Sequence, residues 1–135
     1  MDAENVPLNR DVANEITGTI LECSLHIHSK LGPGLLESVY QACLEHELTR
    51  AGLSVRAQLL LPVVYDGLQI NAGYRIDLLV ADIVIVEVKS VEQILPVHFA
   101  QLLTYLRLAN KRVGLLINFN VAHLRQGVKR IVNGF

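Results

Sequence analysis

Several residue types are scarce in this chain of 135 residues, and each scarcity excludes a class of protein. Tryptophan is absent and aromatic residues make up 5% of the chain, so the exposed aromatic platforms on which some proteins stack bases are not indicated. The chain has 12 lysines and arginines and 13 aspartates and glutamates, which leaves a formal net charge of −1. It therefore lacks the basic excess by which many proteins bind nucleic acid through charge alone.

Long apolar runs and cysteine-rich segments are missing as well. No uninterrupted apolar run approaches the ~20 residues that a membrane-spanning helix needs, and residues 1–9 lack the pattern of a signal peptide. Cys23 and Cys43 fall at apolar positions of expected helices, so we expect them to pack in the core rather than form a disulfide. These features predict a cytoplasmic protein without a membrane partner.

Apolar residues, by contrast, are abundant. Hydrophobic types make up 51% of the chain and charged types 19%, and a chain of 135 residues is long enough for one hydrophobic core. We expect a single domain over residues 1–135. A chain this apolar also leaves room for a self-association surface, so its composition is compatible with a homodimer.

Two amphipathic helices are predicted at the start of the chain. Apolar residues recur every three or four positions over about residues 9–31, and again over about residues 35–51. Gly32-Pro33-Gly34 separates the two helices, and Gly52 ends the second. Two helices therefore precede any strand.

Three strands are predicted next. Alternating apolar residues over about residues 53–65 form the first strand, with a bend or a sheet edge at Pro62. Asp66-Gly67 is typical of a hairpin turn. The chain then returns over about residues 68–80 and continues as a third strand over residues 83–89, so the expected arrangement is an antiparallel meander.

The remaining segments predict a helix, a strand and a last helix. Residues 94–109 have helical periodicity with a start near Pro96, and residues 113–118 form a buried strand. A strand reached across a helix is normally parallel to its neighbour. Asn120 can cap a final helix whose apolar residues are Val121, Leu124, Val128 and Ile131. The predicted order is α-α-β-β-β-α-β-α, an α/β fold with a mixed four-stranded sheet flanked by helices.

Three charged residues interrupt the most apolar of these strands. Asp77 lies in the second strand, and Glu87 and Lys89 lie at the end of the third. Because side chains alternate along a strand, Glu87 and Lys89 share one face. Asp77 joins that face only if an odd loop centred on Asp82, or a bulge, pairs it with Glu87. Charged residues in buried strands predict a functional site. The alternative is that Glu87 and Lys89 form a cross-strand salt bridge, which would stabilise the fold only slightly.

The order of these residues resembles that of a known family. Asp77 followed by Glu87-Val88-Lys89 is similar to the core of the PD-(D/E)XK nuclease superfamily, although Ile76 stands where the name has proline. Residues 34–40, Gly-Leu-Leu-Glu-Ser-Val-Tyr, fit the signature of the superfamily's GxxExxY group. The resemblance implies a restriction-endonuclease-like fold.

Two later motifs extend the resemblance to about residues 16–132. Residues 101–105, Gln-Leu-Leu-Thr-Tyr, fit the QxxxY motif of RecB-like nucleases. Residues 114–119 resemble the last core strand of the GxxExxY group. Four motifs in the right order make the fold assignment specific, whereas they say less about activity.

The resemblance implies a divalent metal centre. Mg²⁺ and Mn²⁺ prefer hard oxygen ligands and take few protein carboxylates. The residues that match the family's metal ligands are Glu37, Asp77, Glu87 and, through its carbonyl, Val88. Lys89 would hold the attacking water and stabilise charge on the phosphate, and Gln101 would orient that water or the lysine. The expected catalytic residues are Glu37, Asp77, Glu87, Lys89 and Gln101.

A further set of residues is expected to contact or support the substrate: Tyr40, Tyr105, Arg125, Lys129 and Arg130. Tyr40 falls on an apolar helix stripe, so a core role and substrate contact both remain open. Tyr105 lies one helical turn after Gln101 and can support it. The three basic residues cluster on the expected last helix, which is either a phosphate-binding face or a solvated one.

The sequence thus predicts a Mg²⁺- or Mn²⁺-dependent nuclease acting on nucleic acid, with DNA favoured over RNA. One alternative is a catalytically inactive module of the same fold that binds nucleic acid or a protein partner. A second alternative is action on a nucleotide or another small phosphate ester, although no Gly-rich phosphate loop supports it.

Overall fold

The computed structural model describes residues 10–134, so the expectation for the N-terminal segment 1–9 lies outside the described residues. The helices are α1 (Arg10–Leu31), α2 (Glu37–Arg50), α3 (Pro96–Ala109) and a 3-10 turn, η2 (Leu124–Gly127). The strands are β1 (Val55–Leu60), β2 (Val63–Tyr65), β3 (Leu68–Ile70), β4 (Arg75–Val80), β5 (Val84–Lys89), β6 (Val113–Asn118) and β7 (Val128–Val132). Within residues 10–134, no helix is long and apolar enough to cross a membrane.

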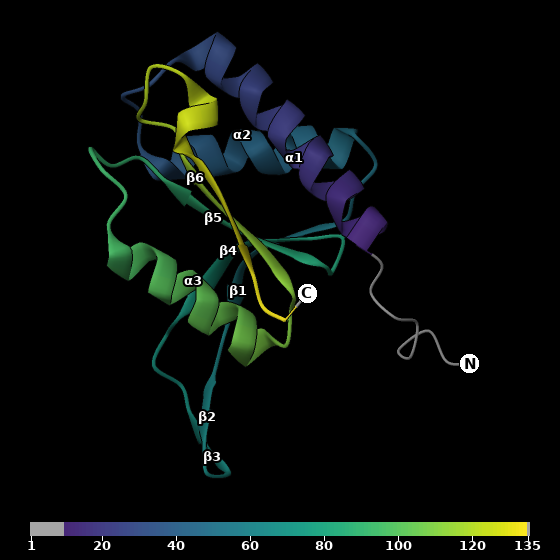
Figure 1. The fold of residues 1–135 in the computed structure, drawn as a ribbon, viewed down its shortest axis with the longest axis vertical. Coiled ribbons are helices and arrows are strands. Elements are labelled where there is room, and N and C mark those ends of the chain that lie inside the picture. The colour runs from purple at the N-terminus through teal and green to yellow at the C-terminus, as the bar shows by residue number, and fades with distance from the viewer. Residues whose placement is uncertain (1–9, 135) are drawn as a thin grey trace.

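A five-stranded sheet with the order β1-β4-β5-β6-β7 forms the middle layer (Figure 1). Its strands pair antiparallel except β5 and β6, which are parallel and joined across α3, as the predicted crossover requires. α1 and α2 cover one face of the sheet and α3 covers the other. Val86 and Val88 pack in the core under α1 and α2, whereas Ile85 packs in the core under α3.

The prediction of a last helix is wrong, and the main sheet has five strands rather than the predicted four. Residues 124–127 form the short turn η2, and residues 128–132 form β7, which pairs antiparallel with β6. A Cβ on Gly127 would lie 2.3 Å from the carbonyl oxygen of Asn118, so only glycine lets the chain return so close to β6. Without β7 the backbone groups along that edge of β6 would lack partners, and this pairing overrides the local helical pattern.

The two long predicted strands are each divided, and the parts next to the Asp66-Gly67 turn form a separate hairpin. β2 and β3 pair only with each other and project from the sheet as an arm, defined here as residues 63–70 (Figure 1). Its turn residues Asp66 and Gly67 have φ values of 50° and 78°, the left-handed pair that the Asp-Gly sequence predicts. At the base of the arm, the Leu61 N–H donates to the Tyr74 carbonyl at 2.9 Å.

Gln58 turns β1 over in the middle of the strand. Its φ of 51° is left-handed, which is rare for a residue other than glycine inside a strand. Before it, Val55 and Ala57 pack against the core under α1 and α2, whereas Leu59 and Leu61 after it pack in the core under α3. The alternation expected over residues 53–65 therefore changes face at Gln58.

Candidate metal centre

The turn between β4 and β5 sets the register that the site depends on. Val80 pairs with Val84 and Leu78 with Val86, so the three-residue loop between the strands is centred on Asp82. Ala81 and Asp82 both have left-handed backbone, with φ values of 54° and 57°, which reverses the chain in three residues. The backbone pairing ends at Leu78 and Val86, and the next two residues, Asp77 and Glu87, are joined instead by a hydrogen bond to a side chain. The odd loop predicted from the sequence is confirmed.

At the end of the β4–β5 hairpin away from this loop, side-chain carboxylates accept hydrogen bonds from the backbone. The Asp77 N–H donates to Glu87 Oε2 at 2.8 Å, and the Val88 N–H donates to Asp77 Oδ2 at 2.9 Å. Each carboxylate thus accepts an amide of the opposite strand. These two bonds hold both acids at fixed positions beside each other.

Burial makes the pair electrostatically unfavourable in the absence of a cation. Glu87 is only 5% exposed, and burial, followed by the charge of Asp77, raises its pKa to about 8. Burial also raises the pKa of Asp77, although the hydrogen bond from Val88 and the charge of Lys89 act in the opposite direction. In the described part of the chain, no ion pair within 4.0 Å joins Lys89 to either acid. A bound cation would therefore stabilise this pair.

Glu37 reaches the same end of β5 from the other side of the sheet. It is the first residue of α2, and its Oε1 accepts the Ser90 N–H at 3.3 Å. Its charge contributes to the raised pKa of both Asp77 and Glu87, so it lies within electrostatic reach of them. Residues 10–134 nevertheless contain no group of three or more His, Cys, Asp and Glu side chains that could hold a metal. Glu37 therefore does not form one compact group with Asp77 and Glu87 in this arrangement.

Tyr40 belongs to the core rather than to a substrate surface. The residue is fully buried, and its ring stacks on Phe119 with the ring centroids 4.5 Å apart. Its hydroxyl donates to the Gly32 carbonyl at 2.6 Å and accepts the Leu35 N–H at 3.1 Å. Tyr40 thereby fixes the loop that leads to Glu37, and substrate contact, the other option left open by the sequence, does not fit its burial.

Gln101 and Tyr105 lie on α3, over the face that carries Glu87. Gln101 Nε2 donates to the Tyr105 hydroxyl at 3.1 Å, as their spacing of four residues permits. Burial raises the pKa of Tyr105, and the charge of Glu87 is the second cause. Both residues line a cavity that also contains Lys89, so α3 and the end of β5 face a common space.

A comparison with protein families agrees with this geometry. A family model described as PD-(D/E)XK nuclease superfamily matches residues 14–131. The chain belongs to the PD-(D/E)XK nuclease superfamily. Nucleases of this superfamily act on nucleic acid and generally use divalent metal ions. No curated protein and no solved structure matches the chain.

The basic residues expected to form one cluster in this superfamily member are dispersed. Lys129 pairs with Leu116, which pairs with Glu87, so it shares the face of Glu87 at about 10 Å, two strand spacings away. Arg130 is the next residue of β7 and therefore points to the opposite face. Arg125 lies in η2, beside a cavity formed with α1. The prediction of a single basic face is wrong, because residues 124–132 form η2 and β7 instead of the helix that would have carried it.

Two polar residues at the site, Gln58 and Asn118, are not predicted from the sequence. Gln58 Nε2 donates to Asp77 Oδ1 at 3.3 Å and to Gln41 Oε1 at 2.9 Å. Asn118 is 2% exposed, and its side chain accepts the Val91 N–H at 3.1 Å and donates to the Val91 carbonyl at 3.0 Å. Both are polar residues within apolar strands, the same signal that drew attention to Asp77.

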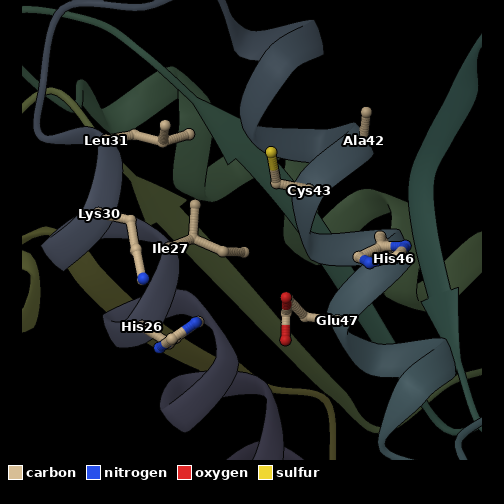
Figure 2. A pocket seen from close by; sticks show the side chains of 8 residues that line it. All are labelled: His26, Ile27, Lys30, Leu31, Ala42, Cys43, His46 and Glu47. Atoms are coloured by element: carbon tan, nitrogen blue, oxygen red, sulfur yellow. The ribbon is translucent and has the colours of Figure 1, made fainter.

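A second cavity, of about 470 Å³, lies between α1 and α2 (Figure 2). Figure 2 shows His26 on α1 and His46 on α2 on opposite sides of it, with Glu47 between them. Cys43 also lines it and is a free thiol. Its lining comes from α1 and α2 and includes none of the strand residues Asp77, Glu87 and Lys89. The carboxylate pair therefore remains the candidate for metal chemistry.

Proposed function

We propose that this superfamily member is a Mg²⁺- or Mn²⁺-dependent nuclease that hydrolyses phosphodiester bonds, with DNA favoured as substrate. The observation that carries the proposal is the carboxylate pair of the buried Glu87 and the half-buried Asp77, which no lysine, arginine or histidine of residues 10–134 joins in an ion pair. The proposal includes membership of the GxxExxY group, for which residues 34–40 provide the support. It also treats residues 1–135 as one domain.

The oxygen donors at this site suit a hard divalent cation. Asp77, Glu87 and the carbonyl of Val88 would hold it, and Glu37 would contribute through a water molecule. When bound, the metal supplies Lewis-acid catalysis. These carboxylates suit a cation, because burial and their like charges raise both pKa values and a bound cation would offset that cost.

Lys89 and Gln101 would act on the reacting groups. The ammonium of Lys89 projects from the same face as Glu87 and would stabilise negative charge that develops on the phosphate oxygens. Gln101, held by its hydrogen bond to Tyr105, would orient the attacking water. Tyr105 would thus act as a positioning residue rather than as an acid or base.

The proposal is tested by incubating the purified full chain with single- and double-stranded DNA and RNA in Mg²⁺ or Mn²⁺. We expect cleavage by the wild type and its loss in Glu87→Ala and Lys89→Ala. Glu92→Ala is the matched control, because Glu92 is an exposed loop acid near the end of β5. The proposal is wrong if the wild type cuts nothing, or if all four proteins cut equally well.

The dispersal of Arg125, Lys129 and Arg130 favours one second candidate. A nuclease fold without a basic surface would fit an inactive module that binds a protein partner. Titration calorimetry with Mn²⁺ separates the candidates, because the nuclease should bind the ion and lose that binding in Glu87→Gln. An inactive module with a purely structural acid pair should bind no ion.

A further inference from the structure

A cavity of about 650 Å³ adjoins the proposed active site on the α3 side of the sheet. Lys89 and Gln101 line it and also belong to the site, so the two spaces are continuous. Val63 and Tyr74 form the wall at the base of the arm, and Tyr105 contributes to the wall on α3. A phosphodiester held at Lys89 would therefore have a neighbouring nucleotide at the mouth of this cavity.

The walls suit a flat, uncharged ring. The lining contains no carboxylate, and the side chains that α3 contributes to it include Ala100, Thr104 and Leu108. The rings of Tyr74 and Tyr105 meet edge to face, with centroids 6.2 Å apart and planes at 60°. This contact fixes the orientation of Tyr74 while 46% of the residue stays accessible.

Polar groups for the edge of a base are also present. His98 Nδ1 accepts the Leu95 N–H at 2.9 Å, so in the neutral ring the other nitrogen carries the proton and can donate. His98, Gln101 and Thr104 all line the cavity, which spans about 15 Å along α3 from His98 to Leu108. A largely apolar cavity with a few polar groups is typical of small-ligand sites of ~300–1,000 Å³, and this volume excludes a base-paired duplex.

We propose that this cavity holds an unpaired nucleobase of the substrate strand, next to the scissile phosphodiester and stacked on Tyr74. The inference rests on the proposed function and deepens it, because it names the substrate class. Strands with at least one unpaired nucleotide at the cleavage point, such as single strands, overhangs and flaps, are then preferred over blunt duplex. The arm contributes Val63 to the cavity wall, so it helps to form the enclosed space that admits an unpaired base and excludes a duplex.

The test measures binding rather than cleavage, by fluorescence anisotropy of labelled oligonucleotides with Ca²⁺ as the divalent ion. One abasic residue is moved along a single-stranded overhang, one position at a time. We expect wild-type affinity to fall about tenfold when the abasic residue occupies one particular position, because stacking of a base on an aromatic ring has about this effect. Tyr74→Ala should show the same loss with the intact strand and no further loss with the abasic strand.

Matched variants separate stacking from other effects. Tyr74→Phe should keep wild-type affinity, and Tyr65→Ala, which removes a 71%-exposed tyrosine of the arm outside the cavity lining, should also keep it. Val97→Trp should narrow the cavity from a position that is 63% exposed, and should reproduce the Tyr74→Ala loss without removing a core contact. An abasic series without any position-dependent loss, or losses from Tyr74→Ala and the abasic residue that simply add, would overturn the proposal.

The outcomes distinguish this inference from the nuclease proposal. Cleavage together with a flat abasic series would leave the nuclease in place and remove the base site. Position-dependent binding without cleavage in Mg²⁺ or Mn²⁺ would keep the base site and remove the nuclease. If sedimentation shows that Tyr74→Ala or Val97→Trp converts a dimer to a monomer, the cavity wall is a subunit interface and the base site is overturned.

Discussion

The two ends of the β4–β5 hairpin satisfy their backbone in different ways. Toward the turn, Leu78 pairs with Val86 and Val80 with Val84, and all four side chains are fully buried and apolar. At the other end, the amides of Asp77 and Val88 donate to the carboxylates of Glu87 and Asp77. We call these the closed end and the open end. The sheet therefore accepts one buried and one half-buried acid where side-chain oxygens replace backbone carbonyls as the partners of backbone amides.

This difference separates stability from chemistry along one hairpin. The closed end contributes burial of apolar area, which stabilises the fold in proportion to the area removed from water. The open end contributes charge that burial disfavours, as the raised pKa of Glu87 indicates. Substitutions at the two ends should consequently affect different measurements.

The largest expected effect is on activity at the open end. Asp77→Asn keeps an oxygen that can accept the Val88 N–H but removes the negative charge, so cleavage should fall by about 10³-fold while the fold persists. The matched control is Asp82→Asn, because Asp82 is the exposed acid at the turn of the same hairpin and pairs with Arg56 and Lys111. Cleavage rates and circular dichroism of both variants test this, and equal rates would contradict it.

The next effect concerns stability at the closed end. Ile85 is fully buried under α3, so Ile85→Ala should lower the free energy of unfolding by about 2–5 kcal/mol through lost burial and a residual cavity. Urea unfolding measures the loss. Cleavage per folded molecule should stay close to that of the wild type. An activity loss as large as that of Asp77→Asn would show that the two ends are not separable.

A smaller effect is the pH dependence of stability without metal. The pKa of Glu87 is raised to about 8 in the folded chain, so folding favours its protonated form. Its stabilising contribution is complete below the ordinary value of 4.5 and is lost as the pH rises through about 8. With a chelator present, the wild type should lose on the order of 2 kcal/mol of stability relative to Glu87→Gln between pH 5 and pH 9. Parallel urea curves for the two proteins would contradict this.

The smallest effect is expected at Gln58, which supports the open end from β1. Gln58→Ala removes the hydrogen bond to Asp77 Oδ1. Mutation of a residue that hydrogen-bonds a metal ligand typically lowers metal affinity by about 10–100-fold. We expect a loss near the lower limit, because Asp77 keeps its bond from Val88. Calorimetric titration with Mn²⁺ measures it. Gln69→Ala, an exposed glutamine of the arm, is the control and should bind as the wild type does.

The sequence alone predicts much of the open end. Polar residues within buried strands identify Asp77, Glu87 and Lys89, and strand alternation assigns the last two to one face. The loop centred on Asp82, which the structure confirms, follows from requiring Asp77 to meet Glu87. The sequence does not single out Gln58, because one amide side chain in a strand is common and a left-handed backbone leaves no mark in the sequence.

By itself, the sequence determined the helices α1, α2 and α3, the parallel pairing of β5 with β6, and the motifs of the nuclease superfamily. Apolar periodicity and turn residues are local, so these features need no knowledge of distant segments. Only the tertiary structure decided that residues 128–132 form β7, that β1 changes face at Gln58, and that the basic residues disperse. These outcomes depend on an unpaired edge of β6 and on contacts with Asp77, and such partners lie far away in the chain.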